Sequence, residues 1–273
     1  MTRLLTALVA AALVAPNIAN AQTAPADGPS PRLADGAVVP CRAGQYNRRA
    51  AHYATQTGEW TRIDLYLGPE EQWDYESVRD DCVAQADAHG RVLATLLDIG
   101  SDDQPDPPNI ARYAAGIERL ARRYRNQVDA WEVWNEPNHP LFGAGMTAES
   151  YGELLRASYA AVKRGDPGAL VVAAGTSSVD LAFLGRVLAT RPPFDALAVH
   201  PYEAPVDAAP GTTPVGLAAL PELRWLMLRY DRREPVWVTE YGWPDGGFLE
   251  QAQAQFTACE YVAVAFVYDW SWH

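Results

Sequence analysis

Residues 128–138 read VDAWEVWNEPN, a short apolar run that ends in a turn with a carboxylate. The run is rich in valine and tryptophan, which is typical of a buried strand, and Pro137 ends strand pairing because it has no backbone N–H. Alternate side chains of a strand lie on one face, so Glu132, Trp134 and Glu136 are expected to point the same way. This stretch therefore predicts a strand with a glutamate at its exit.

The rest of the chain repeats this pattern, because strand-like runs alternate with helical patterns. The other strand-like runs are 37–41, 60–67, 91–99, 169–175, 196–202, 235–243 and 261–270. The helical patterns are 75–90, 109–126, 147–165, 179–190, 216–230 and 249–259, together with a weaker one at 47–56. Thr147 is the expected N-cap of its helix.

Eight strands that alternate with helices predict a single-domain α/β fold, a (β/α)8 TIM barrel over residues 36–273, with the active site at the C-terminal ends of the strands. An open doubly wound sheet is the alternative, but the Gly-rich phosphate turn expected after its first strand is absent from PCRAGQYN at 40–47. No helical pattern follows the last strand, so the barrel is expected to lack its final helix.

The N-terminal residues have the features of an export signal. Arg3 precedes the apolar run 4–14, and small residues at 19–21 offer a cleavage site, so residues 1–21 are interpreted as a signal peptide. Residues 22–35 are rich in Pro and Ala and are interpreted as a flexible leader. The protein is therefore expected to be secreted or periplasmic.

The formal net charge is -12 at pH 7, which argues against nucleic acid and anionic membranes as partners and favours a neutral ligand. Outside the signal, no run reaches the ~18 to 20 apolar residues that a membrane helix needs. Cys41, Cys82 and Cys259 allow at most one disulfide, and their spacing matches no metal motif, so no metal or cofactor is expected. Cys41 and Cys259 would lie near each other if the first and last strands are neighbours, but the sequence leaves the pairing open.

A second glutamate occupies an equivalent place in PVWVTEYGWP at 235–244. Glu240 follows an apolar, β-branched run and precedes glycine and proline, so it too is expected at a strand exit. Counting strands puts Glu136 on the fourth and Glu240 on the seventh, where they can face each other across a barrel mouth. Glycoside hydrolysis needs such a pair, one carboxyl group protonated to assist the leaving oxygen and the other ionised to attack or to activate water.

Two motifs resemble those of the clan A retaining glycoside hydrolases, above all families 39 and 5: WEVWNEPN at 131–138 and VWVTEYGW at 236–243. The resemblance covers about residues 37–272, and it implies a barrel with Glu136 as acid/base and Glu240 as nucleophile. It is incomplete, because the accessory β-domain of family 39 is absent from the sequence.

The resemblance also implies a set of substrate-binding residues, namely Asn135, Arg62, His200, Tyr202 and Trp270. Asn135 corresponds to the amide that contacts the substrate 2-hydroxyl. Arg62 corresponds to the arginine that keeps the nucleophile ionised and oriented. Tyr202 corresponds to a tyrosine able to hydrogen-bond the nucleophile, and Trp270 to a sugar-stacking platform, a place that Trp272 could take instead.

Most of the nine tryptophans are expected in the core. Trp131 and Trp237 alternate onto the helix-facing sides of their strands and are expected to pack there. Trp243 and Trp270 lie near strand ends, which makes them the candidates for stacking on the apolar faces of sugar rings.

Several site residues also have a structural interpretation. Arg62 could pair with Glu132, which is interpreted as a structural carboxylate inside the barrel, because buried charges need partners. His200 could be a core histidine with satisfied hydrogen bonds. His139 is open between a loop residue and a substrate contact.

The sequence therefore predicts an exported, monomeric, retaining β-glycoside hydrolase that cleaves a neutral β-glycan, polysaccharide or oligosaccharide, by double displacement with Glu240 and Glu136. A catalytically reduced carbohydrate-binding barrel is the alternative, and the presence of both glutamates argues against it. An inverting or transglycosylating enzyme would use the same residues and differ in product stereochemistry. Neither the glycan nor endo or exo action can be assigned from these residues.

Overall fold

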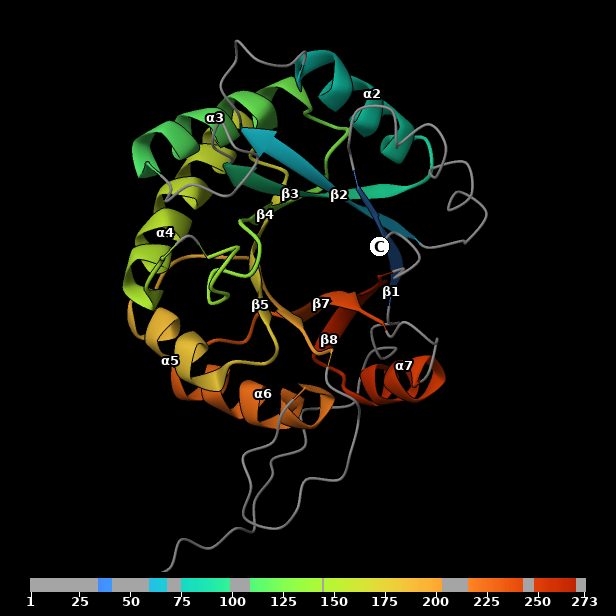
Figure 1. The fold of residues 1–273 in the computed structure, drawn as a ribbon, viewed down its shortest axis with the longest axis vertical. Coiled ribbons are helices and arrows are strands. Elements are labelled where there is room, and N and C mark those ends of the chain that lie inside the picture. Colours follow the sequence, from blue (N-terminus) through green and yellow to red (C-terminus); the bar gives the residue numbers. More distant parts are fainter. Residues whose placement is uncertain are drawn as a thin grey trace, which may run out of the picture. The chain divides into compact units, whose positions relative to one another are not determined.

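The fold was taken from a computed structural model, shown in Figure 1, which describes residues 34–40, 59–67, 75–98, 109–143, 145–202, 216–242 and 248–268. At 34–40 and 75–78 only the backbone is described. The predicted signal peptide at 1–21 and most of the predicted leader lie outside these residues, as do Trp243 and Trp270.

Eight parallel strands pair in chain order and close into a barrel. They are β1 (Ala34–Pro40), β2 (Trp60–Leu67), β3 (Arg91–Asp98), β4 (Ala130–Val133), β5 (Leu170–Ser177), β6 (Ala196–His200), β7 (Val236–Tyr241) and β8 (Val262–Val267). Strand β1 pairs with β2 on one side and with β8 on the other. This closure confirms the predicted TIM barrel and excludes the open sheet. Strand β1 begins at Ala34, inside the last residues of the predicted leader.

Helices connect the strands from β2 onward and lie outside the ring of strands in Figure 1. They are α2 (Tyr75–Asp87), α3 (Ile110–Arg123), α4 (Ala148–Gly165), α5 (Leu181–Ala189), η1 (Gly216–Ala219) with α6 (Leu220–Arg229), and α7 (Leu249–Ala258). The weak pattern at 47–56 and the expected absence of a final helix concern residues outside the described ranges. None of the described helices combines the length and the apolar character that a membrane span requires.

The predicted N-cap of α4 is confirmed. The Ser150 backbone N–H donates to Thr147 Oγ1 over 3.1 Å, and the Thr147 backbone N–H donates to Ser150 Oγ over 2.9 Å. This reciprocal capping box satisfies two N–H groups that would otherwise lack partners, and such a cap stabilises a helix by about 1 kcal/mol. It fixes where α4 begins after the loop that follows β4.

Buried apolar residues form two clusters. The larger one combines residues of strands and helices, and Trp131 belongs to it, as predicted. The smaller cluster consists of strand residues, so it fills the inside of the barrel; its buried members are Trp60, Leu93, Ala130, Val172, Ala196, Ala198, Trp237, Val264 and Phe266. We call this smaller cluster the apolar layer.

Trp237 belongs to the apolar layer, with its ring centroid 5.0 Å from that of Trp60, so the prediction of a helix-facing Trp237 is wrong. The register of β7 is irregular between Val238 and Tyr241. Strict alternation fails there, because both Thr239 and the next residue contact groups inside the barrel. Counting back from Glu240 in steps of two therefore assigned Trp237 to the wrong face.

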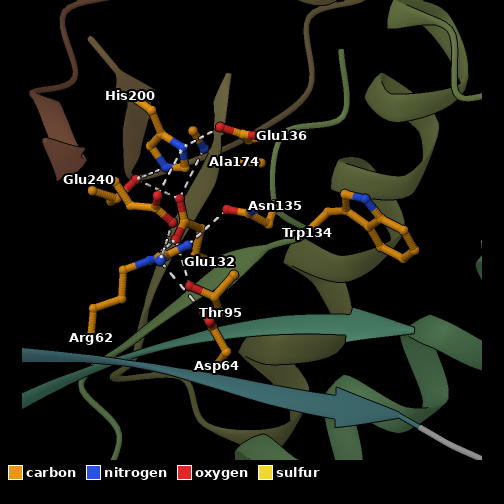
Figure 2. A network of polar contacts seen from close by, with 12 residues as sticks. Arg62, Asp64, Thr95, Glu132, Trp134, Asn135, Glu136, Ala174, His200 and Glu240 are labelled. Atoms are coloured by element: carbon orange, nitrogen blue, oxygen red, sulfur yellow. Dashed lines mark hydrogen bonds and ion pairs between the residues drawn. The ribbon is translucent and has the colours of Figure 1, made fainter. Parts of the chain in front are cut away.

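Trp134 does not share a face with Glu132 and Glu136, contrary to the prediction from alternation. Strand β4 ends at Val133, and Trp134 has a positive φ of 74°. Its indole packs against Tyr113 and donates to the Phe142 carbonyl oxygen over 2.7 Å. Figure 2 shows Trp134 directed away from the polar residues. Glu136 reaches the barrel mouth because the backbone turns here, not because the strand continues.

The cysteines also differ from the expectation based on neighbouring strands. Strands β1 and β8 are neighbours, but Cys259 carries a free thiol. Cys82 in α2 is disulfide-bonded, and Cys41 lies outside the described residues.

Candidate active site

Arg62 is the centre of a buried polar cluster at the C-terminal side of the apolar layer (Figure 2). Its Nε donates to Glu132 over 2.8 Å, its Nη1 to Glu240 over 2.6 Å, and its Nη2 to Asn135 Oδ1 over 2.9 Å. Burial lowers the pKa of Arg62, but the charges of Glu132, Glu240 and Asp64 raise it well above its ordinary value overall. Arg62 is therefore a fixed cation, and both interpretations of it, core pairing with Glu132 and contact with Glu240, describe real contacts.

Glu132 is the structural carboxylate that the sequence predicted. It is fully buried, and besides Arg62 it accepts hydrogen bonds from Thr95 Oγ1 over 2.6 Å, from the Gly175 N–H over 2.9 Å and from Thr239 Oγ1 over 2.8 Å. Burial raises the pKa of Glu132, but the charges of Arg62 and His200, with the hydrogen bonds from Thr95 and Arg62, lower it below its ordinary value overall. Four donors to one carboxylate hold the ends of several strands in a fixed arrangement.

Glu240 is held through both of its carboxylate oxygens. Oε1 accepts from Arg62, and Oε2 accepts from the Tyr202 hydroxyl group. The Tyr202 ring is packed edge-on against Tyr268, with 6.2 Å between centroids. The carboxylate of Glu240 is therefore oriented by two donors and lies at the end of β7, while 9% of the residue remains exposed.

Glu136 stands on a strained backbone, because its φ is 45°, a region that residues other than glycine rarely adopt. Its N–H donates to the Gly175 carbonyl oxygen over 3.0 Å. The turn is tied to β5 by Asn138, whose amide donates to the Ser177 carbonyl and accepts from the Ser177 N–H. These bonds determine where the Glu136 carboxyl group lies.

His200 lies between the two glutamates. Its Nδ1 is 3.1 Å from Glu136 Oε1 and 3.8 Å from Glu240 Oε2, and its Nε2 is 3.0 Å from Thr239 Oγ1. The two glutamate oxygens are therefore no more than about 7 Å apart. This upper limit allows the ~5 to 5.5 Å between carboxyl groups in retaining glycosidases, and it lies at the lower end of the ~6.5 to 9.5 Å found in inverting ones.

The hydrogen bonds of Thr239 fix the proton on His200. Thr239 has one hydroxyl proton and donates it to Glu132, so it accepts from His200 and Nε2 carries a proton. In the neutral ring Nδ1 is then an acceptor, and the contact with Glu136 requires a proton on that carboxyl group or on Nδ1 itself. Burial lowers the pKa of His200, but the charge of Glu240 and the hydrogen bond to Glu136 raise it overall. One proton is therefore shared between His200 and Glu136.

Gly175 was not identified from the sequence, although three contacts of the site depend on it. Its N–H binds Glu132, and its carbonyl oxygen binds Glu136. A Cβ atom here would lie 2.1 Å from His200 Nε2 and 2.8 Å from Thr239 Oγ1, so a side chain would displace the histidine ring. A glycine near the end of a strand is the sequence signal for such a close approach.

Asp64 is the second residue that sequence reasoning missed. It follows Arg62 by two positions on β2, so alternation alone places it on the same face. Its Oδ1 lies 3.5 Å from Arg62 Nη1. Asp64 could have been found from the sequence TRIDLYL at 61–67, because it lies two residues after Arg62.

The predicted site residues Glu136, Glu240, Asn135, Arg62, His200 and Tyr202 all meet in this cluster. His139 does not join it in the contacts described: its ring packs against Phe142, and its Nδ1 accepts from the Leu141 N–H. Trp243 and Trp270 lie outside the described residues. Within the described ranges, no group of three or more His, Cys, Asp or Glu side chains is arranged to hold a metal ion.

Solved structures with a similar fold include glycosidases. A glucosidase from Croceicoccus marinus superposes with a TM-score of 0.69 at 17% identity, over 88% of this chain and 60% of its own. A GH39 enzyme from Xanthomonas axonopodis pv. citri superposes with a TM-score of 0.64 at 16% identity, over 88% of this chain and 58% of its own. The β-glucanase SdGluc5_26A from Saccharophagus degradans superposes with a TM-score of 0.56 at 16% identity, over 86% of this chain and 78% of its own. The barrel shares its fold with these enzymes.

This likeness agrees with the resemblance to clan A families 39 and 5 that the two motifs carry. No family model matches the chain, and no curated protein matches it in sequence. The chain spans about three fifths of the length of the first two solved structures.

Proposed function

We propose that this chain is an exported retaining β-glycosidase in which Glu240 is the nucleophile and Glu136 the acid/base. The observation that carries the proposal is the geometry around His200, which lies within 4 Å of one oxygen from each glutamate. Two carboxyl groups at this separation, at the C-terminal ends of β4 and β7, can flank one glycosidic bond. The glycosidases with the same fold support the reaction class.

In the first step the Glu240 carboxylate attacks the anomeric carbon, and the bond to the leaving-group oxygen breaks. Arg62 and Tyr202 each donate to one oxygen of Glu240 and so aim the carboxylate, which nucleophilic attack requires. The proton shared by Glu136 and His200 is the one that the leaving oxygen needs. His200 thus acts as a positioning residue that supports the acid form of Glu136.

In the second step water attacks the glycosyl-enzyme, and Glu136, now a carboxylate, accepts its proton. The bond to Glu240 breaks, and the sugar leaves with its original configuration. Two inversions at the anomeric carbon give net retention, and the proton returns to the Glu136–His200 pair for the next turnover.

Asn135 is suited to contact the sugar 2-hydroxyl. A guanidinium only donates, so the atom that faces Arg62 is Oδ1, and the NH2 group of Asn135 has no hydrogen bond to the described residues. It can therefore donate to substrate. A hydrogen bond to the 2-hydroxyl that strengthens in the transition state lowers the barrier.

The substrate that fits these charges is a neutral β-glycan, and the protein is proposed to act on it as a monomer without a cofactor. Arg62 serves the anions Glu132, Glu240 and Asp64 together, so it offers no spare positive charge to a substrate carboxylate. The net charge of -12 also disfavours polyanions.

The test is hydrolysis of aryl β-glycosides and neutral β-linked polysaccharides by the full chain and by Glu240→Gln. We expect kcat/KM to fall by at least about 10⁴-fold in the variant, because covalent catalysis is lost. Glu234→Gln is the matched control, since Glu234 precedes β7 and pairs with Arg232 outside the site, and it should retain activity. A folded wild type that binds glycans without turnover would instead indicate a carbohydrate-binding barrel.

A further inference from the structure

Asp64 carries a carboxylate beside the nucleophile that the proposed mechanism does not use. It lies on β2, two residues toward the C-terminal end from Arg62, which is the direction of the barrel mouth. Its side chain is 22% exposed, so it is open to the mouth, yet Oδ1 itself is buried. The carboxylate is therefore partly enclosed and partly accessible to a ligand.

Oδ1 of Asp64 has no hydrogen-bond donor among the described residues. Arg62 Nη1 is directed to Glu240 at 2.6 Å and lies 3.5 Å from Asp64, too far for a good hydrogen bond. Buried polar atoms without a partner are rare in folded proteins, because losing water without a replacement is costly. The 22% of the side chain that is exposed lies away from Oδ1, so the other oxygen of the carboxylate is the one that can accept a hydrogen bond from a substrate.

We propose that Asp64 accepts a hydrogen bond from a hydroxyl group of the glycone, the sugar whose anomeric carbon Glu240 attacks, and so makes the site selective for neutral glycones over uronic acids. This rests on the proposed function, since it concerns the same site. Sugar hydroxyl groups are donors that match a carboxylate acceptor. A uronate would bring a further negative charge to a place where Asp64, Glu132 and Glu240 already share Arg62.

The electrostatics of Asp64 agree with this role. Burial raises the pKa of Asp64 to about 6 against the opposing charge of Arg62, with Glu240 and Glu132 raising it and His200 lowering it. A hydroxyl donor stabilises the ionised form, so binding a neutral sugar relieves the unfavourable burial of this charge.

The experiment pairs substrate deletions with protein variants. Aryl β-glycosides of the preferred glycone, and the analogues that each lack one hydroxyl group, are hydrolysed by wild type and by Asp64→Ala. In the wild type, removal of the hydroxyl that binds Asp64 should lower kcat/KM by about 10- to 100-fold, the loss expected for a hydrogen bond to a charged group. In Asp64→Ala, removal of the same hydroxyl group should lower kcat/KM by less than about 3-fold, while removal of each other hydroxyl group should lower it as much as in the wild type.

Asp64→Asn tests the charge and serves if Asp64→Ala does not fold, because it keeps the shape of the side chain. The ratio of kcat/KM on an aryl β-glucuronide to that on the aryl β-glucoside should rise at least about 10-fold in this variant. Asp98→Asn is the control, since Asp98 is a buried carboxylate at the end of the next strand that pairs with Arg112, and it should leave the ratio unchanged.

The outcomes separate the two proposals. A wild type that hydrolyses glycosides, with equal effects of every hydroxyl deletion in wild type and Asp64→Ala and an unchanged ratio in Asp64→Asn, overturns the role of Asp64 alone. A folded wild type that hydrolyses no glycoside overturns the proposed function, and the role of Asp64 in it falls with it.

Discussion

The two halves of the barrel interior differ in chemistry, although the same strands build both. On five strands a residue of the apolar layer is followed two positions later by a residue of the polar cluster: Trp60 and Arg62, Leu93 and Thr95, Ala130 and Glu132, Ala198 and His200, Trp237 and Thr239. We call the second members of these pairs the polar layer. The apolar layer depends on close packing, whereas each charge in the polar layer depends on its partners, so substitutions in the two layers should have different consequences.

Arg62→Met should have the largest effect in the polar layer. It leaves Glu132 and Glu240 buried without their cation, and breaking a buried pair in this way costs about 3 to 5 kcal/mol of unfolding free energy. In the molecules that remain folded, kcat/KM should also fall by about 10³-fold or more, because Arg62 no longer orients Glu240. Urea unfolding and steady-state kinetics measure the two effects. If both stability and activity were kept, the polar layer would not be an interdependent network.

Phe266→Ala should produce a similar loss of stability in the apolar layer without the loss of activity. Phe266 is fully buried, and Phe→Ala substitutions in cores cost about 3 to 5 kcal/mol. Below the melting temperature, kcat/KM of the folded protein should stay within about 3-fold of wild type, since Phe266 packs with the apolar layer, where its ring contacts Trp237. A collapse of kcat/KM equal to that of Arg62→Met would show that the layers are not separable.

Gly175→Ala should disturb the polar layer through a single methyl group. The added Cβ would meet His200 Nε2 at 2.1 Å, so the ring must shift and its contact with Glu136 is disturbed, and overpacking of this kind costs about 1 to 3 kcal/mol. We expect kcat/KM to fall by about 10- to 100-fold, with a changed pH profile because the Glu136–His200 proton is no longer shared.

Gly185→Ala is the matched control for that substitution. Its Cβ would make ordinary contacts with Leu226 at 3.7 Å, and Gly185 lies in α5, where alanine is the better helix former by about 1 kcal/mol. Activity should be unchanged and stability slightly raised. An equal loss of activity in both variants would mean that Gly175 has no specific role at His200.

Asp64→Asn should stabilise the protein in a pH-dependent way. The pKa of Asp64 is raised from 3.8 to about 6, so between these values the folded state binds more protons than the unfolded state. Protonated Asp64 therefore adds to the free energy of unfolding below about pH 4, and this contribution is lost as the pH rises through about 6. The variant should therefore match wild type at low pH and exceed it by up to about 3 kcal/mol above pH 7. A stability difference that does not change with pH would contradict the raised pKa.

Much of the barrel could be predicted from the sequence because strand positions follow from local composition. The runs that end in Glu136 and Glu240 are apolar and stop at proline or glycine, so both glutamates could be placed at strand exits. Arg62 could be paired with Glu132 because a buried charge needs a partner.

The rest depended on backbone geometry that local composition does not encode. Trp134 turns outward through a positive φ, and its N–H is held by the Leu96 carbonyl of another strand. Trp237 faces inward because of an irregular register with β8. The role of Gly175 exists only because His200 arrives from a different strand. Such features arise from contacts between distant segments, which override simple alternation.

The most direct test of the account is the anomeric configuration of the sugar first released from an aryl β-glycoside, followed by proton NMR before mutarotation. Double displacement through Glu240 predicts the β-anomer first, with the α-anomer appearing later at the rate of spontaneous mutarotation. Release of the α-anomer first would show a single displacement by water and would contradict the assignment of Glu240 as nucleophile.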